Sequence, residues 1–516
     1  MQLLRCRRIL PYKYVLLTTR DNPDAHLMNP APPLLTRRAL PELTAHLLSP
    51  GWCEPDIGIV HLGIGNFHRA HQALYTEEAV AAAGGNWGIC GVTLKADTGK
   101  RDALTAQDGL YSVVERGPAG ECVTVARIVR EVLALPDDRA RLFERLADPR
   151  VRIVSLTVTE KGYCRDAETG DVDFGHPDIA HDLKHPESPS TVPGLLVAAL
   201  RRRMADPFAV LCCDNLAHNG AATRQVVASY ARALDPSLAE WIVRDVAFPS
   251  TMVDRIVPAT TDADRTSAFA ALGYTDVMPV PCEPFRQWVI EDRFPGGRPA
   301  WEKAGAQLVD DVTPFELAKL RMLNGTHSTI AYLSMLAGIE TVDAAIGEKP
   351  IYRLIHAMMT EEIAPTLSVP PSFDVHAYRD ALLERYANPA LKHRCAQIAM
   401  DGSQKIPPRL LGPIAERLAA GQPFPRLALA VAAWMQFLRG RTDDGTPYEI
   451  NDPLAARLTH AAQGAADTPQ ALADALLGVR EVFPEVLAGS RVVREALAQA
   501  LSALREGAKY AVDAYA

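Results

Sequence analysis

The sequence predicts an α/β protein with a doubly wound, Rossmann-type N-terminal domain and a mostly α-helical C-terminal domain. At 516 residues the chain exceeds the size that one hydrophobic core usually supports, so two domains are expected. From Ile57 onward, short apolar runs alternate with amphipathic stretches, which is typical of a parallel sheet with crossover helices. Beyond about Asp311 the strand pattern fades and helical spacing takes over.

These patterns also predict the individual elements. Strands are expected over residues 57–62, 87–94, 151–159 and 208–213. Helices are expected over residues 69–83, 138–146, 193–204, 314–337, 378–386, 427–439 and 491–504. We therefore expect the Rossmann-type domain over residues 28–310 and the helical domain over residues 311–516. Residues 1–27 are expected to be a poorly ordered or artificial extension, with translation starting at Met28.

Composition argues against several classes of partner and site. Asp and Glu outnumber Lys and Arg by 62 to 54, and no long basic run occurs, which argues against a nucleic-acid partner. No apolar run approaches the roughly 20 residues of a membrane span. The nine cysteines form no Cys-x-x-Cys pair, so the sequence predicts no metal site and favours a reducing, cytoplasmic location. The oligomeric state is left open.

A glycine turn follows the first predicted strand. Gly63 and Gly65 would let the backbone approach a pyrophosphate at the start of the next helix. His68 stands where the usual fingerprint has a third glycine, so a plain strand-to-helix turn is the alternative. Asp97 could accept ribose hydroxyls and favours NAD over NADP, although Lys95 could attract a 2′-phosphate. The predicted cofactor-binding residues are Gly63, Gly65, Asn66, Phe67, His68, Arg69 and Asp97.

Asn215 follows the predicted strand 208–213 and should therefore lie at the carboxyl edge of the sheet. Ligands of open α/β sheets bind beyond that edge, where an asparagine could donate a hydrogen bond to a developing alkoxide. An Asx-type turn that merely ends the strand is the alternative. The residue alone does not decide between the two.

The predicted helix at residues 315–327 carries polar residues on one side. Lys319, Asn324 and His327 fall within an arc of roughly 140° on an α-helix and could converge on one small ligand. A lysine can act as general base toward a hydroxyl if burial lowers its pKa, and in reverse it protonates a carbonyl oxygen. Glu316, one turn earlier, could relay the proton to solvent. A solvated helix face with a salt-bridged lysine is the alternative.

Six stretches of the chain carry a family resemblance. They are Gly63–Gln72 (GIGNFHRAHQ), Ser155–Cys164 (SLTVTEKGYC), Cys213–Asn215, Met252–Pro258, Cys282–Asp292 and Lys319–Ser328 (KLRMLNGTHS). In them the chain resembles the long-chain mannitol dehydrogenase family, from about Ile57 almost to the C-terminus. Matches of this length in the same order are far more specific than the glycine turn alone.

The resemblance implies roles for the candidate residues. It makes Lys319 the acid/base, has Asn215 and Asn324 hold the reacting oxygen, and has His327 orient the substrate. Asp254 matches a substrate-pocket position, and Glu316 matches a proposed proton channel. Preorganised donors of this kind polarise the oxygen without a metal.

The resemblance also implies a substrate class. Mannitol-specific members have an arginine where this chain has Gln397, whereas residues 388–394 and 397–405 look like a branch that interconverts D-fructuronate and D-mannonate. Arg394, Lys405 or Arg409 could bind the sugar-acid carboxylate. We therefore expect an NAD-dependent oxidoreductase acting on a small sugar acid. The alternatives are a polyol dehydrogenase acting on mannitol or arabinitol, and a catalytically silent NAD-binding sensor.

Overall fold

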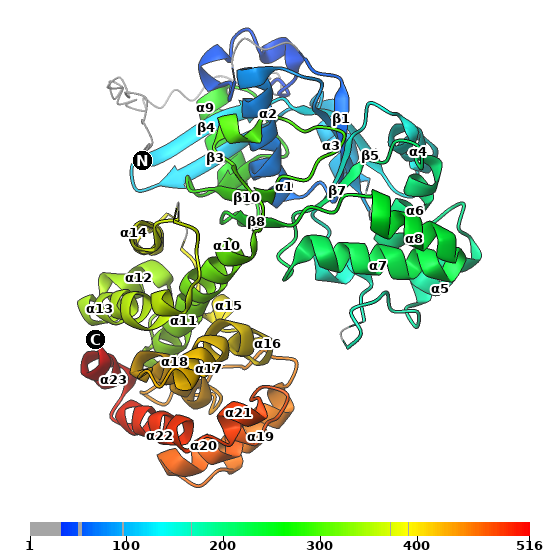
Figure 1. Cartoon of the computed structure of the whole chain (residues 1–516). Coiled ribbons are helices and arrows are strands. Elements are labelled where there is room, and N and C mark those ends of the chain that lie inside the picture. The colour runs from blue at the N-terminus through cyan, green and yellow to red at the C-terminus, as the bar shows by residue number, and fades with distance from the viewer. Residues whose placement is uncertain (1–31, 50–53, 95–97, 167, 372, 391) are drawn as a thin grey trace, which may run out of the picture.

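The computed structural model describes residues 32–49, 54–94, 98–166, 168–371, 373–390 and 392–516 (Figure 1). The predicted extension 1–27, Met28, Lys95 and Asp97 lie outside these ranges. The N-terminal half contains a five-stranded sheet in the order β5-β2-β1-β6-β7, and every strand pair in it is parallel. The strands are β1 (Ile57–Leu62), β2 (Gly88–Thr93), β5 (Val129–Ala134), β6 (Ile153–Leu156) and β7 (Ala209–Cys212).

Helices cover both faces of this sheet because side chains alternate across each strand. Val60 and Leu62 of β1 point into one core, together with residues of α4 (Arg139–Ala147), α6 (Val192–Arg202) and α7 (Asn219–Leu234). Ile59 points into the opposite core, together with α2 (Gln72–Ala83). The predicted doubly wound Rossmann-type domain is confirmed.

Two small sheets were not predicted. One is β4-β3-β9, formed by β3 (Tyr111–Gly117), β4 (Gly120–Ala126) and β9 (Val280–Cys282). The other is β11-β10-β8, formed by β8 (Thr251–Asp254), β10 (Gln287–Glu291) and β11 (Gln307–Val309). The hairpin β3–β4 closes at Gly120, whose φ of 115° favours glycine. The predicted parallel sheet is therefore only part of the N-terminal half.

Two predicted elements have different ends in the structure. The expected helix 69–83 starts earlier and is interrupted at His71, giving α1 (Asn66–Ala70) and α2. The expected strand 151–159 ends at Leu156, because the backbone N–H groups of Val158 and Thr159 donate to the Asp214 carboxylate at 3.0 and 2.9 Å. Asp214 therefore turns the chain out of the sheet beside the predicted site.

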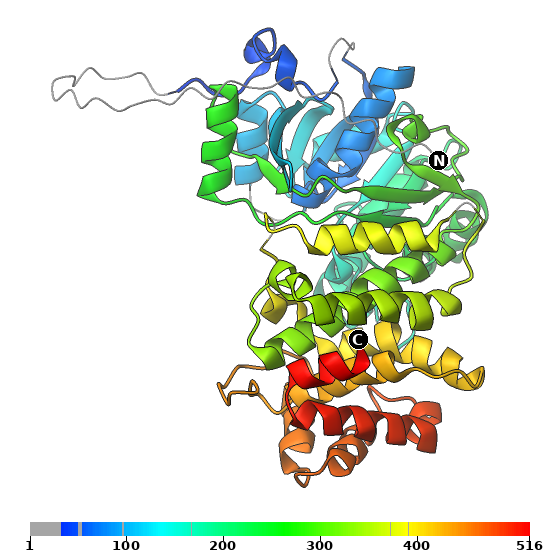
Figure 2. The same ribbon diagram turned by 90° about the vertical axis from the view of Figure 1, so that its left-hand side faces the viewer.

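The C-terminal half is helical, as predicted. Its longest helical rod consists of α10 (Thr313–Ala318), a π-helix (Lys319–Gly325) and α11 (Thr326–Ala337). α18 (Pro425–Phe437) packs against α11, and α22 (Arg491–Arg505) packs on α18. Another helix of this half is α14 (Val375–Tyr386). Figures 1 and 2 show these helices stacked below the sheet half, and α14 lies at the border of the two halves. The boundary predicted at residues 310/311 falls between β11 and α10 and stays a prediction.

None of the helices in the described ranges is long and apolar enough to cross a membrane.

Candidate active site

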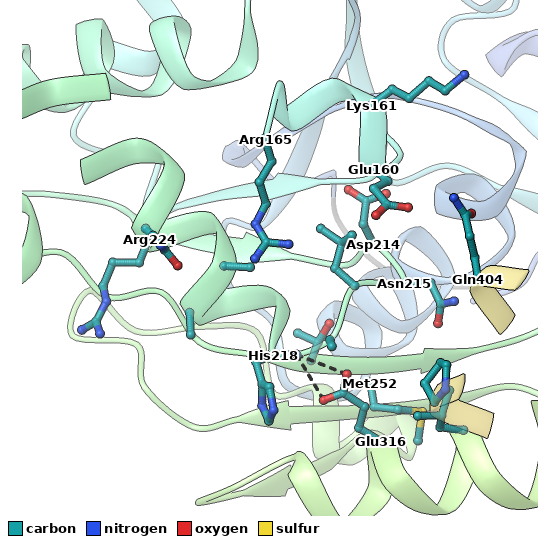
Figure 3. Close-up of a pocket in the computed structure, with 18 of the residues that line it drawn as sticks. Glu160, Lys161, Arg165, Asp214, Asn215, His218, Arg224, Met252, Glu316 and Gln404 are labelled. Carbon is teal, nitrogen blue, oxygen red and sulfur yellow. Dashed lines mark hydrogen bonds between the residues drawn. The ribbon is translucent and has the colours of Figure 1, made fainter. Parts of the chain in front are cut away.

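A cleft of about 1570 Å³ is lined by residues of both halves. Asn215 enters it from the loop after β7, and Val253 enters it from β8. Glu316 and Lys319 come from the helical rod, and Gln404 comes from α16 (Gly402–Ile406). Figure 3 shows Asn215, Glu316 and Gln404 approaching from these three elements. The predicted catalytic helix therefore faces the carboxyl edge of the sheet.

Lys319 is fixed by two acceptors at the wall of the cleft. Its Nζ atom donates to Asn215 Oδ1 at 3.1 Å and to the Val253 carbonyl at 2.7 Å. Burial lowers the pKa of Lys319, and the charge of Asp254 opposes the shift. Because Asn215 Oδ1 accepts from the lysine, the amide nitrogen of Asn215 is left to donate to a bound oxygen. A general acid/base and an oxyanion donor are thus adjacent.

The π-helix changes the predicted register of the catalytic side chains. On an α-helix, Asn324 would be rotated by about 140° from Lys319. A π-helix closes i to i+5 hydrogen bonds, so Asn324 lies one turn above Lys319 on the same face. Both residues line the cleft. The local winding, rather than α-helical periodicity, brings them together.

His327 is not on the wall of the cleft. Its ring is buried against Tyr386 and His393, with centroid distances of 4.5 and 5.4 Å. Burial lowers the pKa of His327 well below the usual value, so the ring is neutral. The expected role of His327 in orienting substrate therefore has no support in this arrangement.

Asp254 is occupied by an ion pair rather than open to substrate. Its carboxylate accepts from Arg385 of α14 at 2.7 and 3.2 Å. Glu283 binds the same guanidinium at 2.8 and 3.1 Å, and all three side chains are buried. The Asp254–Arg385–Glu283 cluster joins the two halves of the chain, and the role of Asp254 as a substrate ligand stays a prediction.

Removing the cation from this cluster should destabilise the protein strongly. Arg385→Met leaves two buried carboxylates without their partner, which is expected to lower the free energy of unfolding by about 3–5 kcal/mol. The matched control is Arg457→Met, because the Arg457–Glu481 pair is exposed at 56% and 43% and should contribute about 0–1 kcal/mol. Urea unfolding of both variants measures the difference, and equal losses would contradict the prediction.

Glu316 has the surroundings expected of a proton relay. It lines the cleft one turn before Lys319, and its carboxylate oxygens accept from the backbone N–H of His218 at 3.2 and 3.3 Å (Figure 3). Burial raises the pKa of Glu316, so its carboxyl accepts a proton more readily than an exposed one. Its relay role stays a prediction.

Two cations lie on the helical wall of the cleft. Lys405 donates to the carbonyls of Met400 and Ile398 at 2.6 and 3.3 Å, and its Nζ lies 3.8 Å from the Asp401 carboxylate. Arg409 Nη1 donates to Ser328 Oγ at 3.0 Å and to the Asn324 carbonyl at 3.4 Å. In the described part of the chain, no carboxylate lies within ion-pair distance of Arg409.

Arg394 and Gln397 do not line this cleft. They line a separate cavity of about 400 Å³ rather than the wall of this cleft, and their role in substrate binding stays a prediction. The physical reason is the left-handed turn at Asp401, with φ 57°, which separates α15 (Cys395–Ile398) from the helix that carries Lys405. Nearness in sequence to Lys405 was therefore misleading.

The glycine turn has the form that a dinucleotide requires. Gly63 has φ 96°, and a Cβ there would lie 2.2 Å from the Thr157 carbonyl. A Cβ on Gly65 would meet only the Gly63 carbonyl at 3.7 Å, so the backbone at Gly65 is open to a ligand. This open stretch fits the close approach of a pyrophosphate.

The side chains of the residues that follow the turn do not point at this open stretch of backbone. His68 is buried and stacks on His61 with ring centroids 3.4 Å apart. Arg69 is buried and donates to Asn66 Oδ1 at 2.8 Å, and Asn66 Nδ2 donates to Thr260 Oγ1 at 3.1 Å. Phe67 stacks on His71. The prediction is therefore corrected for the side chains of His68 and Arg69, which lie inside the protein.

Within the ranges that the structure describes, no group of three or more His, Cys, Asp or Glu residues could hold a metal ion.

Sequence reasoning missed Asp214 and Arg385. The Asp214 carboxylate also accepts from Tyr163 at 2.7 Å, so it shapes the loop beside Asn215. Its position directly before Asn215 was the available signal. Nothing in the sequence pairs Arg385 with two carboxylates more than a hundred residues away.

The lowered pKa of Lys319 predicts a pH dependence. Alcohol oxidation needs the neutral amine, so its rate should rise with pH and level off below the ordinary lysine pKa of 10.5. Carbonyl reduction needs the ammonium and should fall over the same range. Initial rates in both directions measure the profile. A rate of oxidation that is still rising at pH 10.5, the ordinary pKa of lysine, would contradict the prediction.

Known proteins share both halves of the chain. A model of the mannitol dehydrogenase Rossmann domain matches residues 57–303, and a model of the mannitol dehydrogenase C-terminal domain matches residues 311–505. D-mannonate oxidoreductase of Escherichia coli is 44% identical, over 83% of this chain and 89% of that protein. Mannitol 2-dehydrogenase of Aspergillus terreus is 40% identical, over 87% of this chain and 91% of that protein.

Solved structures agree with these matches. Mannitol 2-dehydrogenase of Pseudomonas fluorescens, in a ternary complex with NAD and D-mannitol, superimposes with a TM-score of 0.79 at 38% identity, over 93% of this chain and 99% of that one. A substrate-free D-sorbitol dehydrogenase gives a TM-score of 0.86 at 35% identity, over 93% of this chain and 100% of that one.

Proposed function

Since this chain belongs to the mannitol dehydrogenase family, as the resemblance indicated, we propose that it is an NAD-dependent oxidoreductase that interconverts D-fructuronate and D-mannonate. The observation that carries the proposal is the half-buried ammonium of Lys319, held by Asn215 and the Val253 carbonyl. The same cleft contains Arg409, a guanidinium with no carboxylate partner among the described residues.

The reaction adds a hydride to the ketone carbon and a proton to its oxygen. NAD, when bound at the open backbone of Gly65, supplies or accepts the hydride. In reduction, Lys319 donates a proton to the developing alkoxide while the amides of Asn215 and Asn324 stabilise its charge. In oxidation, the neutral amine removes the hydroxyl proton, and Glu316 passes it toward solvent.

The cations of the cleft support a sugar acid over a polyol. Sequence identity does not separate the two, because D-mannonate oxidoreductase and mannitol 2-dehydrogenase are 44% and 40% identical to this chain. A half-buried guanidinium without a carboxylate partner is costly in the free protein. A substrate carboxylate would satisfy Arg409 through charge-assisted hydrogen bonds, whereas the hydroxyls of mannitol or arabinitol leave its charge uncompensated.

A substrate panel tests the proposal. NADH oxidation is followed with D-fructuronate and with D-fructose, which shares the ketone but has no carboxylate. We expect a higher kcat/KM for D-fructuronate. A preference for D-fructose would favour the polyol dehydrogenase, and NADH binding without turnover on any substrate would favour the silent sensor.

We also propose a cytoplasmic location. Cys90, Cys212 and Cys282 are buried free thiols, which a reducing compartment maintains.

A further inference from the structure

A chain of buried and partly buried hydrogen bonds ends on the glycine turn. His61 lies in β1 and is fully buried. Its Nδ1 atom lies 2.8 Å from Ser155 Oγ, and its Nε2 atom lies 2.8 Å from Thr157 Oγ1. Thr157 Oγ1 in turn donates to the Gly63 carbonyl at 2.9 Å. The relay Ser155–His61–Thr157 therefore connects β6 to the turn that follows β1.

The direction of every proton in this relay is determined. A threonine hydroxyl has a single proton, and Thr157 gives it to the Gly63 carbonyl. His61 must therefore donate from Nε2 to Thr157 and accept at Nδ1 from Ser155. Burial lowers the pKa of His61 to about 3, so the ring keeps this neutral tautomer at physiological pH.

The relay acts on the carbonyl that shapes the turn. Gly63 adopts φ 96°, and its carbonyl also accepts from the backbone N–H of Gly65 at 2.6 Å. The N–H groups of Gly63 and Ile64 donate to the Val92 carbonyl of β2 at 2.8 and 3.0 Å. Strand β2 thus holds the N–H groups of the turn, and the relay holds its carbonyl.

The ring of His61 also supports the residues that follow the turn. His68 of α1 stacks on it with an interplanar angle of 12°. One side chain therefore contacts β6 through hydrogen bonds and α1 through its ring face. Moving His61 would shift Gly65, the position where the backbone is open to a ligand, relative to the sheet.

We propose that His61 is a positioning residue that acts through Thr157 to hold the Gly63–Gly65 turn in the shape that binds the dinucleotide. The inference rests on the proposed function only in that NADH must bind at this turn. His61 itself touches no substrate and takes part in no proton transfer.

Two pairs of variants test the relay through the dissociation constant of NADH, measured by fluorescence without substrate. His61→Asn keeps an acceptor near Nδ1 and loses the donor to Thr157, whereas His61→Gln can place an amide N–H near Nε2. Thr157→Val removes the hydroxyl with little change of shape, and Thr157→Ser restores it. The control is Thr223→Val, which removes a hydroxyl on α7 that is more deeply buried than that of Thr157 and donates to the Asn219 carbonyl.

We expect His61→Asn and Thr157→Val to raise the Kd for NADH at least about tenfold. His61→Gln and Thr157→Ser should recover most of the affinity, and Thr223→Val should leave it unchanged. At saturating NADH, the KM for the sugar should not change in the folded variants. If His61→Asn does not fold, the Thr157 pair decides alone.

The two proposals fail in different ways. An unchanged Kd in Thr157→Val, or an equal loss in Thr223→Val, would overturn the relay while leaving the proposed function intact. Wild-type protein that does not bind NADH would overturn the proposed function, and the relay with it.

Discussion

Replacing Lys319 with alanine is expected to lower turnover at least about a hundredfold while leaving NADH binding nearly unchanged. The variant removes the ammonium that donates to Asn215 Oδ1 and that we propose exchanges a proton with the reacting oxygen. Asn215 and Asn324 would still polarise that oxygen, so some residual turnover should remain. Single-turnover reduction at saturating NADH isolates the loss to the chemical step.

The control is an exposed lysine outside the cleft. Lys303→Ala removes a charge of the same type from the surface and should keep wild-type turnover. Normal turnover in Lys319→Ala would contradict the acid/base assignment. A matching loss of NADH affinity would mean that the lysine acts through folding of the cleft rather than through proton transfer.

Replacing Arg409 with methionine is expected to lower kcat/KM for D-fructuronate by about ten- to a hundredfold, the range that loss of a charge-assisted hydrogen bond produces. The rate with D-fructose, which has no carboxylate, should stay the same or rise. Methionine keeps much of the apolar length of the side chain, so the change removes mainly the charge and the donors. Kinetics with both sugars give the selectivity directly.

Two further variants separate charge from position. Arg409→Lys keeps the charge but not the planar pair of donors and should lie between wild type and Arg409→Met. Arg394→Met removes an arginine from the neighbouring cavity and should have no effect on selectivity. An equal loss for D-fructuronate and D-fructose in Arg409→Met would show that the residue only supports the fold beside Ser328.

Much of the fold could be predicted from local patterns. β1 and β2 lie within about a residue of their predicted ends, because a strand buried on both faces is a continuous apolar run between polar breaks. The hairpin β3–β4 was missed, and the strand at β6 was predicted too long. Its end is set by Asp214, which bonds to Val158 and Thr159 from 55 or more residues away.

In the candidate site, too, the sequence predicted the place of some residues and not of others. Lys319, Asn215, Asn324 and Glu316 were predicted and line one cleft, and Lys405 also lies on its wall. Their roles in catalysis and binding stay predictions. Other side chains lie where the sequence did not place them: Asp254 is bound to Arg385 and His68 is stacked on His61, which are contacts with distant partners. Arg394 and Gln397 face another cavity because of the local turn at Asp401.

The sequence by itself determined the family, the division into a parallel-sheet half and a helical half, and the types of residue that can carry the chemistry. Only the tertiary structure decided which of those side chains share a cleft, because burial and ion pairing join residues that lie far apart in the chain. The π-helix at Lys319–Gly325 is the clearest case, since this change of winding brings Lys319 and Asn324 closer to one face than the roughly 140° that α-helical spacing gives them.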